Sequence, residues 1–259
     1  ALLSFPPFWQ MGTRFLAAGF GLLLWMRWRG ATMPTPVQWR NATIIGALLL
    51  GGGMGGTAYA EQSIASGLIV AFIAISPAMI ALLNLPFGIR PARLEVLGIS
   101  IGIVGVLMLT QGAGFAASPV GLIAISLASF CWSLGSVLSQ RKFPLAKGAV
   151  GFASEMICGG VLLMAMAWAA GEAPQWPPQP LAAWSWLYLV VFGSLIAFNA
   201  YMVLLERTRP ALASSYSFVN PLIAMLLGIF IAGEVVTSFE WLSAGVIIAG
   251  VVAIVLGHR

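Results

Sequence analysis

Long apolar segments alternate with short polar connections along the whole chain. Each segment is close to the ~20 residues that an α-helix needs to cross the hydrocarbon core of a bilayer. The pattern therefore predicts an all-α polytopic membrane protein. Nine membrane-spanning helices are expected, at residues 6–28, 41–61, 66–86, 95–112, 119–140, 148–170, 182–205, 211–231 and 239–257.

The composition agrees with this prediction. Charged residues make up 7% of the chain and hydrophobic residues 60%, whereas a soluble domain carries about 25% charged residues. The net charge of +5 does not indicate nucleic-acid binding, because the basic residues are scattered and form no single patch. The expected partner is the lipid bilayer, whose anionic headgroups attract such residues.

Basic residues occur only in alternate connections, with Arg14 as the exception. They are Arg27, Arg29, Arg40, Arg90, Arg93, Arg141, Lys142, Lys147, Arg207, Arg209 and Arg259. The intervening connections, which include Glu61 and Glu172, carry none. By the positive-inside rule the basic connections are cytoplasmic, so the C-terminus is predicted to lie in the cytoplasm of a bacterium, with the protein in its inner membrane.

A weak internal repeat relates the two parts of the chain. At an offset of 141 residues the matched pairs are Arg14 and Glu155, Gly19 and Gly160, and Leu22 and Leu163. Pro77 recurs as Pro221 at an offset of 144. The first repeat is expected in residues 1–112 and the second in residues 119–259.

The repeat also predicts a helix that this chain does not contain. The segment 119–140 opens the second repeat, and its counterpart would precede residue 1. The expected architecture is therefore ten helices in two five-helix repeats, nine of them in this chain with the first absent. Five is an odd number, so the second repeat is inverted. The N-terminus of such a complete protein would be cytoplasmic.

Several short motifs resemble the EamA branch of the drug/metabolite transporter superfamily. They are 5–8 (Phe-Pro-Pro-Phe), 12–16 (Gly-Thr-Arg-Phe-Leu), 131–136 (Cys-Trp-Ser-Leu-Gly-Ser), 211–216 (Ala-Leu-Ala-Ser-Ser-Tyr), 219–221 (Val-Asn-Pro), 233–234 (Gly-Glu) and 240–242 (Glu-Trp-Leu). The resemblance covers the whole chain and is strongest to bacterial exporters of amino acids and metabolites. It implies the ten-helix inverted-repeat fold and export of small molecules. Ile89 stands where the family often has an acidic residue before Arg-Pro.

Polar groups inside a bilayer are costly and usually functional. Arg14 and Glu155 are the charged residues expected near the middle of helices. Arg14 is interpreted as attracting a substrate carboxylate or closing an outer gate, with Glu155 opposite. The alternative is that each satisfies backbone groups or extends towards the interface.

Aromatic walls with a few polar groups suit a ligand the size of an amino acid. The further substrate-binding candidates are Tyr59, Trp132, Asn199, Tyr201, Tyr216, Ser217 and Asn220. Each ring taken alone is more often part of the core or of the interfacial belt. Glu95, Glu206 and Glu240 are interpreted as charges at helix ends near water, and Glu61 and Glu234 as solvated outer ends.

Pro77 and Pro221 are predicted at the centres of their helices. Each removes an amide donor, so these positions are hinge candidates, with static kinks as the alternative. The run of glycines in residues 51–56 indicates close helix packing or local unwinding.

The chain lacks Asp and has His258 as its single histidine, which argues against an intramembrane hydrolase or a histidine metal site. No phosphate-binding loop occurs, so no cofactor is expected.

The predicted function is a secondary transporter that exports amino acids, aromatic or other neutral ones among them, by alternating access. Alternatives are a multidrug or cation exporter and a structural membrane subunit. Proton coupling would use Glu155 or Glu61; uniport and exchange stay open, as does the oligomeric state.

Overall fold

The computed structural model describes residues 4–64, 66–112, 118–208, 210–227, 230 and 237–257, and these residues fold as helices and short connections. Arg209, Glu234, His258 and Arg259 lie outside the described residues. The solvated helix end predicted at Glu234 therefore falls outside the described residues.

The described helices follow one another as nine rods, close to the nine segments predicted. They are α1 (Pro7–Trp28); α2 (Pro36–Gly46), η1 (Ala47–Gly55) and α3 (Gly56–Ala60); α4 (Ser66–Ala74), α5 (Ser76–Asn84) and η2 (Leu85–Phe87); α6 (Arg93–Leu109) and η3 (Thr110–Gly112); α7 (Pro119–Arg141); α8 (Ala149–Ala169); α9 (Pro180–Tyr188), η4 (Leu189–Phe198) and α10 (Asn199–Arg207); α11 (Pro210–Ser214) and α12 (Tyr216–Leu227); and α13 (Ser238–Gly257). The elements η1 and η4 are π-helical, whereas η2 and η3 are 3-10 turns.

Six rods of the described part are long and apolar enough to cross a membrane. They are Pro36–Ala60, Leu68–Phe87, Pro119–Arg141, Ala149–Ala169, Pro180–Arg207 and Ser238–Gly257. The helix α1 is long enough at 22 residues but contains Gln10, Arg14 and Arg27. The α-helical part of α6 has 17 residues, and the rod of α11 and α12 is interrupted at Ser215.

The second rod begins five residues earlier than predicted, at Pro36 rather than at residue 41. A capping box explains the difference. The Gln38 amide donates to Thr35 Oγ1 (3.3 Å) and the Thr35 amide donates to Gln38 Oε1 (2.8 Å), which satisfies two donors that a helix start leaves unpaired. Pro36 occupies the first turn, where its missing N–H costs nothing.

The helices group into two compact units. Unit 1 contains Ala1–Tyr59 and Leu134–Arg207, and unit 2 contains Ala60–Ser133 and Thr208–Arg259. Neither unit coincides with a predicted repeat, because each takes helices from both halves of the chain. The helix α7 begins in unit 2 and ends in unit 1.

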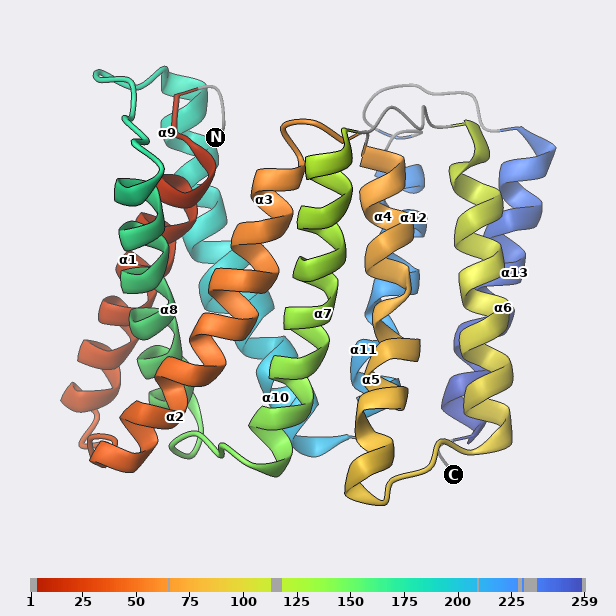
Figure 1. The fold of residues 1–259 in the computed structure, drawn as a ribbon, viewed down its shortest axis with the longest axis horizontal. Coiled ribbons are helices and arrows are strands. Elements are labelled where there is room, and N and C mark those ends of the chain that lie inside the picture. Colours follow the sequence, from red (N-terminus) through yellow and green to blue (C-terminus); the bar gives the residue numbers. More distant parts are fainter. Residues whose placement is uncertain are drawn as a thin grey trace. The chain divides into compact units, whose positions relative to one another are not determined.

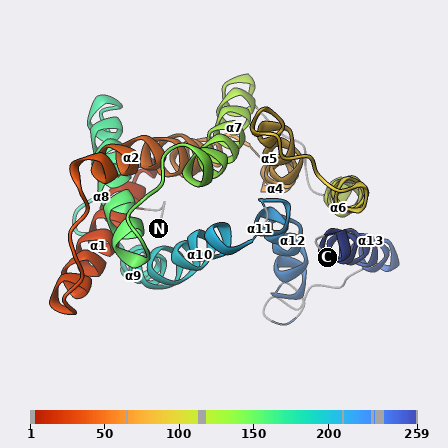
Figure 2. The same cartoon turned by 90° about the horizontal axis from the view of Figure 1, so that it is seen from below.

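Unit 1 is built around the contact between α1 and α8, which lie side by side in Figure 1 and Figure 2. A Cβ on Gly12 would meet the Met164 side chain and one on Gly19 would meet Ile157, so the two helices run antiparallel. The rod of α2 and η1 packs on α8 equally closely. A Cβ on Gly46 would lie 2.8 Å from the Glu155 carbonyl oxygen, and only glycine permits that approach.

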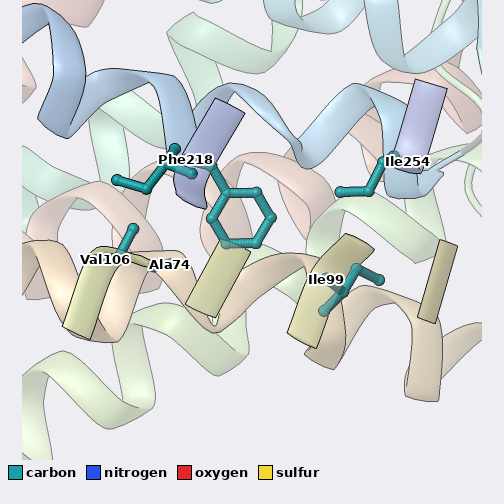
Figure 3. Packing of buried hydrophobic residues seen from close by; sticks show 6 residues of the cluster. Ala74, Ile99, Val106, Phe218 and Ile254 are labelled. Carbon is teal, nitrogen blue, oxygen red and sulfur yellow. The ribbon is translucent and has the colours of Figure 1, made fainter. Parts of the chain in front are cut away.

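Unit 2 is organised by a second antiparallel pair, α6 and α13, which Figure 1 also shows side by side. A Cβ on Gly98 would lie 2.6 Å from the Gly250 carbonyl oxygen. The core beside this pair contains Phe218, whose ring lies over Gly102. Figure 3 shows this cluster: Ala74, Ile99, Val106, Phe218, Ile247 and Ile254. A smaller cluster contains Ala60, Ile64, Ile69, Ile125 and Ala128.

Candidate substrate site

Arg14 is buried about two turns from the start of α1, with 3% of its surface exposed. Its guanidinium carbon lies 4.6 Å from the centre of the Phe15 ring, and Nη2 lies 4.0 Å from the Met54 sulfur in η1. A Cβ on Gly193 in η4 would lie 3.8 Å from Nη1. The guanidinium therefore contacts η1 and lies near η4.

Glu155 is fully buried in α8, with 0% of its surface exposed. Neither carboxylate oxygen accepts a hydrogen bond within the part of the chain that the structure describes. An ionised carboxylate buried in this way costs several kcal/mol unless a cation or a proton neutralises it. Glu155 is thus a buried acidic group whose desolvation no hydrogen bond from the described residues offsets.

The structure places Arg14 and Glu155 in the same unit, on the two helices that form its central contact. Both residues lie away from that contact, since α1 meets α8 through Gly12, Leu16 and Gly19. No hydrogen bond joins the two side chains among the described residues, because Glu155 accepts none. The predicted placement of Glu155 opposite Arg14 therefore stays a prediction.

Three more candidates belong to unit 1 and differ in what their side chains contact. Tyr59 is 39% exposed and stacks on Phe8 with ring centres 5.8 Å apart. Tyr201 is 8% exposed, and its hydroxyl shares a 2.7 Å hydrogen bond with Ser136. Asn199 Nδ2 donates to the carbonyl oxygens of Ser194 (3.1 Å) and Leu195 (2.9 Å) in η4, so its amide nitrogen is already used by the backbone.

The remaining binding candidates, Trp132, Tyr216, Ser217 and Asn220, belong to unit 2. Trp132 and Tyr216 are half-buried. Ser217 is buried and its hydroxyl donates to the Ser214 carbonyl oxygen at 2.9 Å, whereas Asn220 is exposed.

The two prolines are not placed alike. Pro77 lies in the first turn of α5, directly after the interruption at Ile75. Pro221 lies inside α12, and the interruption of its rod comes earlier, at Ser215. A local 3-10 turn marks that interruption, since the Ser215 amide donates to Leu212 and the Phe218 amide to Ser215.

One acidic residue differs from expectation. Glu95 is buried rather than solvated, and its Oε2 accepts a 2.8 Å hydrogen bond from the Ala92 amide at the start of α6. A glutamate at the third position of a helix satisfies the N-cap amide in this way. The prediction that Glu95 stands near water is wrong for that reason.

Sequence reasoning did not name Met54, Thr57, Gly193 or Ser136 as candidate site residues. The glycine run at 51–56, for which close packing or local unwinding was expected, lies mostly in the π-helical element η1. The sequence of η4, Leu-Val-Val-Phe-Gly-Ser-Leu-Ile-Ala-Phe, carries no such signal. No cluster of three or more His, Cys, Asp or Glu suited to a metal ion occurs among the residues described.

A family model for EamA-like transporters matches residues 1–111 and 119–256. The chain belongs to the EamA-like transporter family. The resemblance drawn from the motifs is thereby confirmed. The EamA-family assignment makes this protein a membrane transporter rather than an enzyme.

Known relatives of this EamA-family protein agree with the assignment. It is 41% identical over 255 residues to the inner membrane transporter YedA of Escherichia coli (strain K12), covering 98% of this chain and 83% of YedA. It is 29% identical over 269 residues to the transporter sll0355 of Synechocystis sp. (strain ATCC 27184 / PCC 6803 / Kazusa), covering 93% and 79%. The protein is thus a homologue of a multi-pass inner membrane transporter. Neither name specifies a substrate.

A protein of known crystal structure shares the fold. The two structures superpose with a TM-score of 0.78 over 98% of this chain and 88% of the other, at 22% sequence identity. At that identity the likeness concerns the fold alone.

Proposed function

We propose that this EamA-family protein exports amino acids or related small metabolites across the bacterial inner membrane by alternating access. The observation that carries the proposal is the buried guanidinium of Arg14, which lies within unit 1 against the Phe15 ring and the Met54 sulfur. A cation kept inside a membrane protein is costly and usually serves transport. A planar guanidinium binds a carboxylate through two parallel hydrogen bonds, which suits the acidic end of an amino acid.

Glu155 supports the same substrate class, because its carboxylate suits the ammonium group of an amino acid. Its buried carboxylate accepts no hydrogen bond within the described residues, so an ammonium group would find both a charge and free acceptor positions there. One basic and one acidic group on helices of the same unit suit a zwitterion, with aromatic residues such as Tyr59 providing apolar contact.

Glu155 also favours a second candidate function, the export of cationic compounds. A cation without a carboxylate needs Glu155 and has no use for Arg14. The two candidates therefore differ in whether substrates must carry a carboxylate.

Alternating access would use the interruptions in the rods of unit 2. The helix is interrupted at Ile75 before Pro77, and at Ser215 before Pro221. We assign the hinges of the transport cycle to these two places. In this proposal the basic connections and the C-terminus lie in the cytoplasm. The two repeats, residues 1–112 and 119–259, would then be inverted halves of one carrier, as the antiparallel course of α1 and α8 supports.

Counterflow in proteoliposomes tests the proposal directly. Vesicles containing the purified protein are preloaded with one unlabelled amino acid at a time, and uptake of the labelled compound is followed. The matched vesicles are preloaded with a lipophilic cation such as tetraphenylphosphonium. Protein-free vesicles give the background.

Accelerated uptake with a defined set of amino acids, reached only at higher concentrations when their carboxamides are used, is the expected result. Acceleration with tetraphenylphosphonium alone would replace amino-acid export by cation export. No exchange with any amino acid by monodisperse protein would overturn the proposal.

A further inference from the structure

Two long π-helical elements occupy related positions in unit 1. The element η1 spans nine residues from Ala47 and η4 spans ten residues from Leu189. Their starts are 142 residues apart, which lies between the offsets of 141 and 144 that relate the two repeats. Most π-helical turns in proteins are single-turn bulges, and they are frequent at functional sites. Two long ones at related positions therefore indicate a shared role.

Just after the end of each π-helical element, a side chain donates a hydrogen bond to a backbone carbonyl oxygen of that element. Thr57 Oγ1 donates to the Gly53 carbonyl oxygen in η1 at 2.8 Å. Asn199 Nδ2 donates to the carbonyl oxygens of Ser194 and Leu195 in η4, at 3.1 and 2.9 Å. Thr57 and Asn199 are also 142 residues apart, so the same device recurs in both halves of the chain.

The register of the backbone changes at these places. A π-helix pairs residues five apart and an α-helix pairs residues four apart. Where η1 passes into α3, the Gly56 amide donates to the carbonyl oxygens of Gly52 and Gly53; where η4 passes into α10, the Asn199 amide donates to Ile196. The side chains of Thr57 and Asn199 add further donors at these changes of register, and each added hydrogen bond stabilises the place where the π-helical turns end.

The two elements share one neighbour, the guanidinium of Arg14. Nη2 contacts the Met54 sulfur of η1 at 4.0 Å, and a Cβ on Gly193 of η4 would lie 3.8 Å from Nη1. Met54 and Gly193 lie inside the two elements, so their positions beside Arg14 depend on each element keeping its π-helical register.

We infer that Thr57 and Asn199 are positioning residues for Arg14, which they hold through η1 and η4 in the place where it binds the carboxylate of the substrate. The inference rests on the proposed function, because it concerns the same site. According to this inference, Thr57 and Asn199 affect how the protein binds the carboxylate of the ligand. They do not affect how it binds the side chain of the ligand.

The transport test uses Thr57→Val and Asn199→Leu in the full-length chain. Half-saturation concentrations are measured in counterflow for the amino acid that the screen selects and for its carboxamide, for example L-phenylalanine and L-phenylalaninamide. Loss of a hydrogen bond that positions a charged group should raise the value for the amino acid about ten-fold. The value for the carboxamide and the maximal rate should not change, and Thr57→Ser should restore wild-type behaviour.

Two matched controls separate positioning from helix stability. Thr43→Val removes the same type of bond, from Thr43 Oγ1 to the Trp39 carbonyl oxygen (3.0 Å), in the α-helical part of the same rod. Asn84→Leu removes the bond from Asn84 Nδ2 to the Ile80 carbonyl oxygen (2.8 Å) in unit 2. Neither should alter the discrimination between amino acid and carboxamide. Equal losses for both compounds in Thr57→Val and Asn199→Leu would overturn the inference.

A second measurement needs no ligand. Hydrogen–deuterium exchange in detergent micelles should accelerate at the end of η1 in Thr57→Val and of η4 in Asn199→Leu, but not there in the two controls. Unchanged exchange would overturn the inference even if the protein transports amino acids. A different result is also decisive. If hydrogen–deuterium exchange accelerates in the variants but the wild-type protein transports no amino acid, the role of Thr57 and Asn199 in substrate binding is overturned together with the proposed function.

Discussion

Glu155 and Arg14 show how single residues shape the interior of unit 1. The guanidinium of Arg14 contacts the Phe15 ring and the Met54 sulfur, whereas Glu155 accepts no hydrogen bond from the described residues. A group of the second kind gains more from a bound cation, since nothing in the protein compensates its desolvation. Substrate affinity should therefore respond most strongly to Glu155.

Glu155→Gln is expected to raise the half-saturation concentration for amino acids at least about ten-fold, because a neutral amide loses a charge-assisted hydrogen bond to the ammonium group. Counterflow measures the effect, and Glu206→Gln at the exposed end of α10 is the control. Wild-type half-saturation in Glu155→Gln would remove Glu155 from the binding site. Wild-type transport at every pH tested would in addition exclude it as a proton carrier.

At the scale of elements, glycine decides how closely helices approach. The contact of α2 with α8 depends on Gly46 and that of α6 with α13 on Gly98. Gly21 on α1 is the opposite case, because nothing lies within 4 Å of the position of its Cβ.

Gly46→Leu is expected to destabilise the protein by about 1–3 kcal/mol, since the added side chain would collide with the backbone of α8. Thermal unfolding in detergent, followed by loss of the monodisperse peak in size-exclusion chromatography, measures the change. Gly21→Leu should leave the transition where it is. An unchanged transition in Gly46→Leu would show that α2 and α8 separate without cost.

Pro221→Ala restores an amide donor inside α12. It should slow substrate exchange in counterflow while the folded fraction stays constant, because a continuous helix bends less readily. Pro77→Ala should act in the same direction at the start of α5. Pro119→Ala, in the first turn of α7, changes no backbone hydrogen bond of a helix interior and is the control. Unchanged rates in folded Pro221→Ala protein would exclude the hinge there.

Hydrophobic patterning predicts the rods well because each buried or lipid-facing segment must be apolar over about 20 residues. It cannot predict where a rod changes register. The η4 sequence is apolar except for Ser194, and its hydrogen bonds from Asn199 and its packing against α1 are visible only in the structure. The charged site candidates Arg14 and Glu155 were visible because charges are rare in such segments. The contacts of Arg14 with Met54 and Gly193 required the three-dimensional structure.

At the scale of the whole molecule, the compact units cross the boundary between the predicted repeats. Unit 1 needs α1, α2 and η1 from the first half and α8, η4 and α10 from the second. Unit 2 likewise combines α6 with α13. Neither half alone contains the partner of its own central helix.

Residues 1–112 and residues 118–259 are therefore expected to be unstable when each is produced alone, because each exposes the helix faces that the other covers. Coexpression of the two segments in one cell should restore a complex that copurifies and is monodisperse. Size-exclusion chromatography after affinity purification by a tag on one segment measures this. A monodisperse, helical segment 118–259 without its partner would contradict the expectation.

The crossing of units and repeats has a consequence for descent. Suppose that the two halves arose from one five-helix ancestor. That polypeptide could then form unit 1 only as a dimer with a second copy in the opposite orientation. It must therefore have been inserted into the membrane in both orientations. Such a dimer carries the same residue at the positions of Arg14 and Glu155. Opposite charges at these positions became possible only after the ancestral gene was duplicated, and with them the two ends of a ligand could be distinguished.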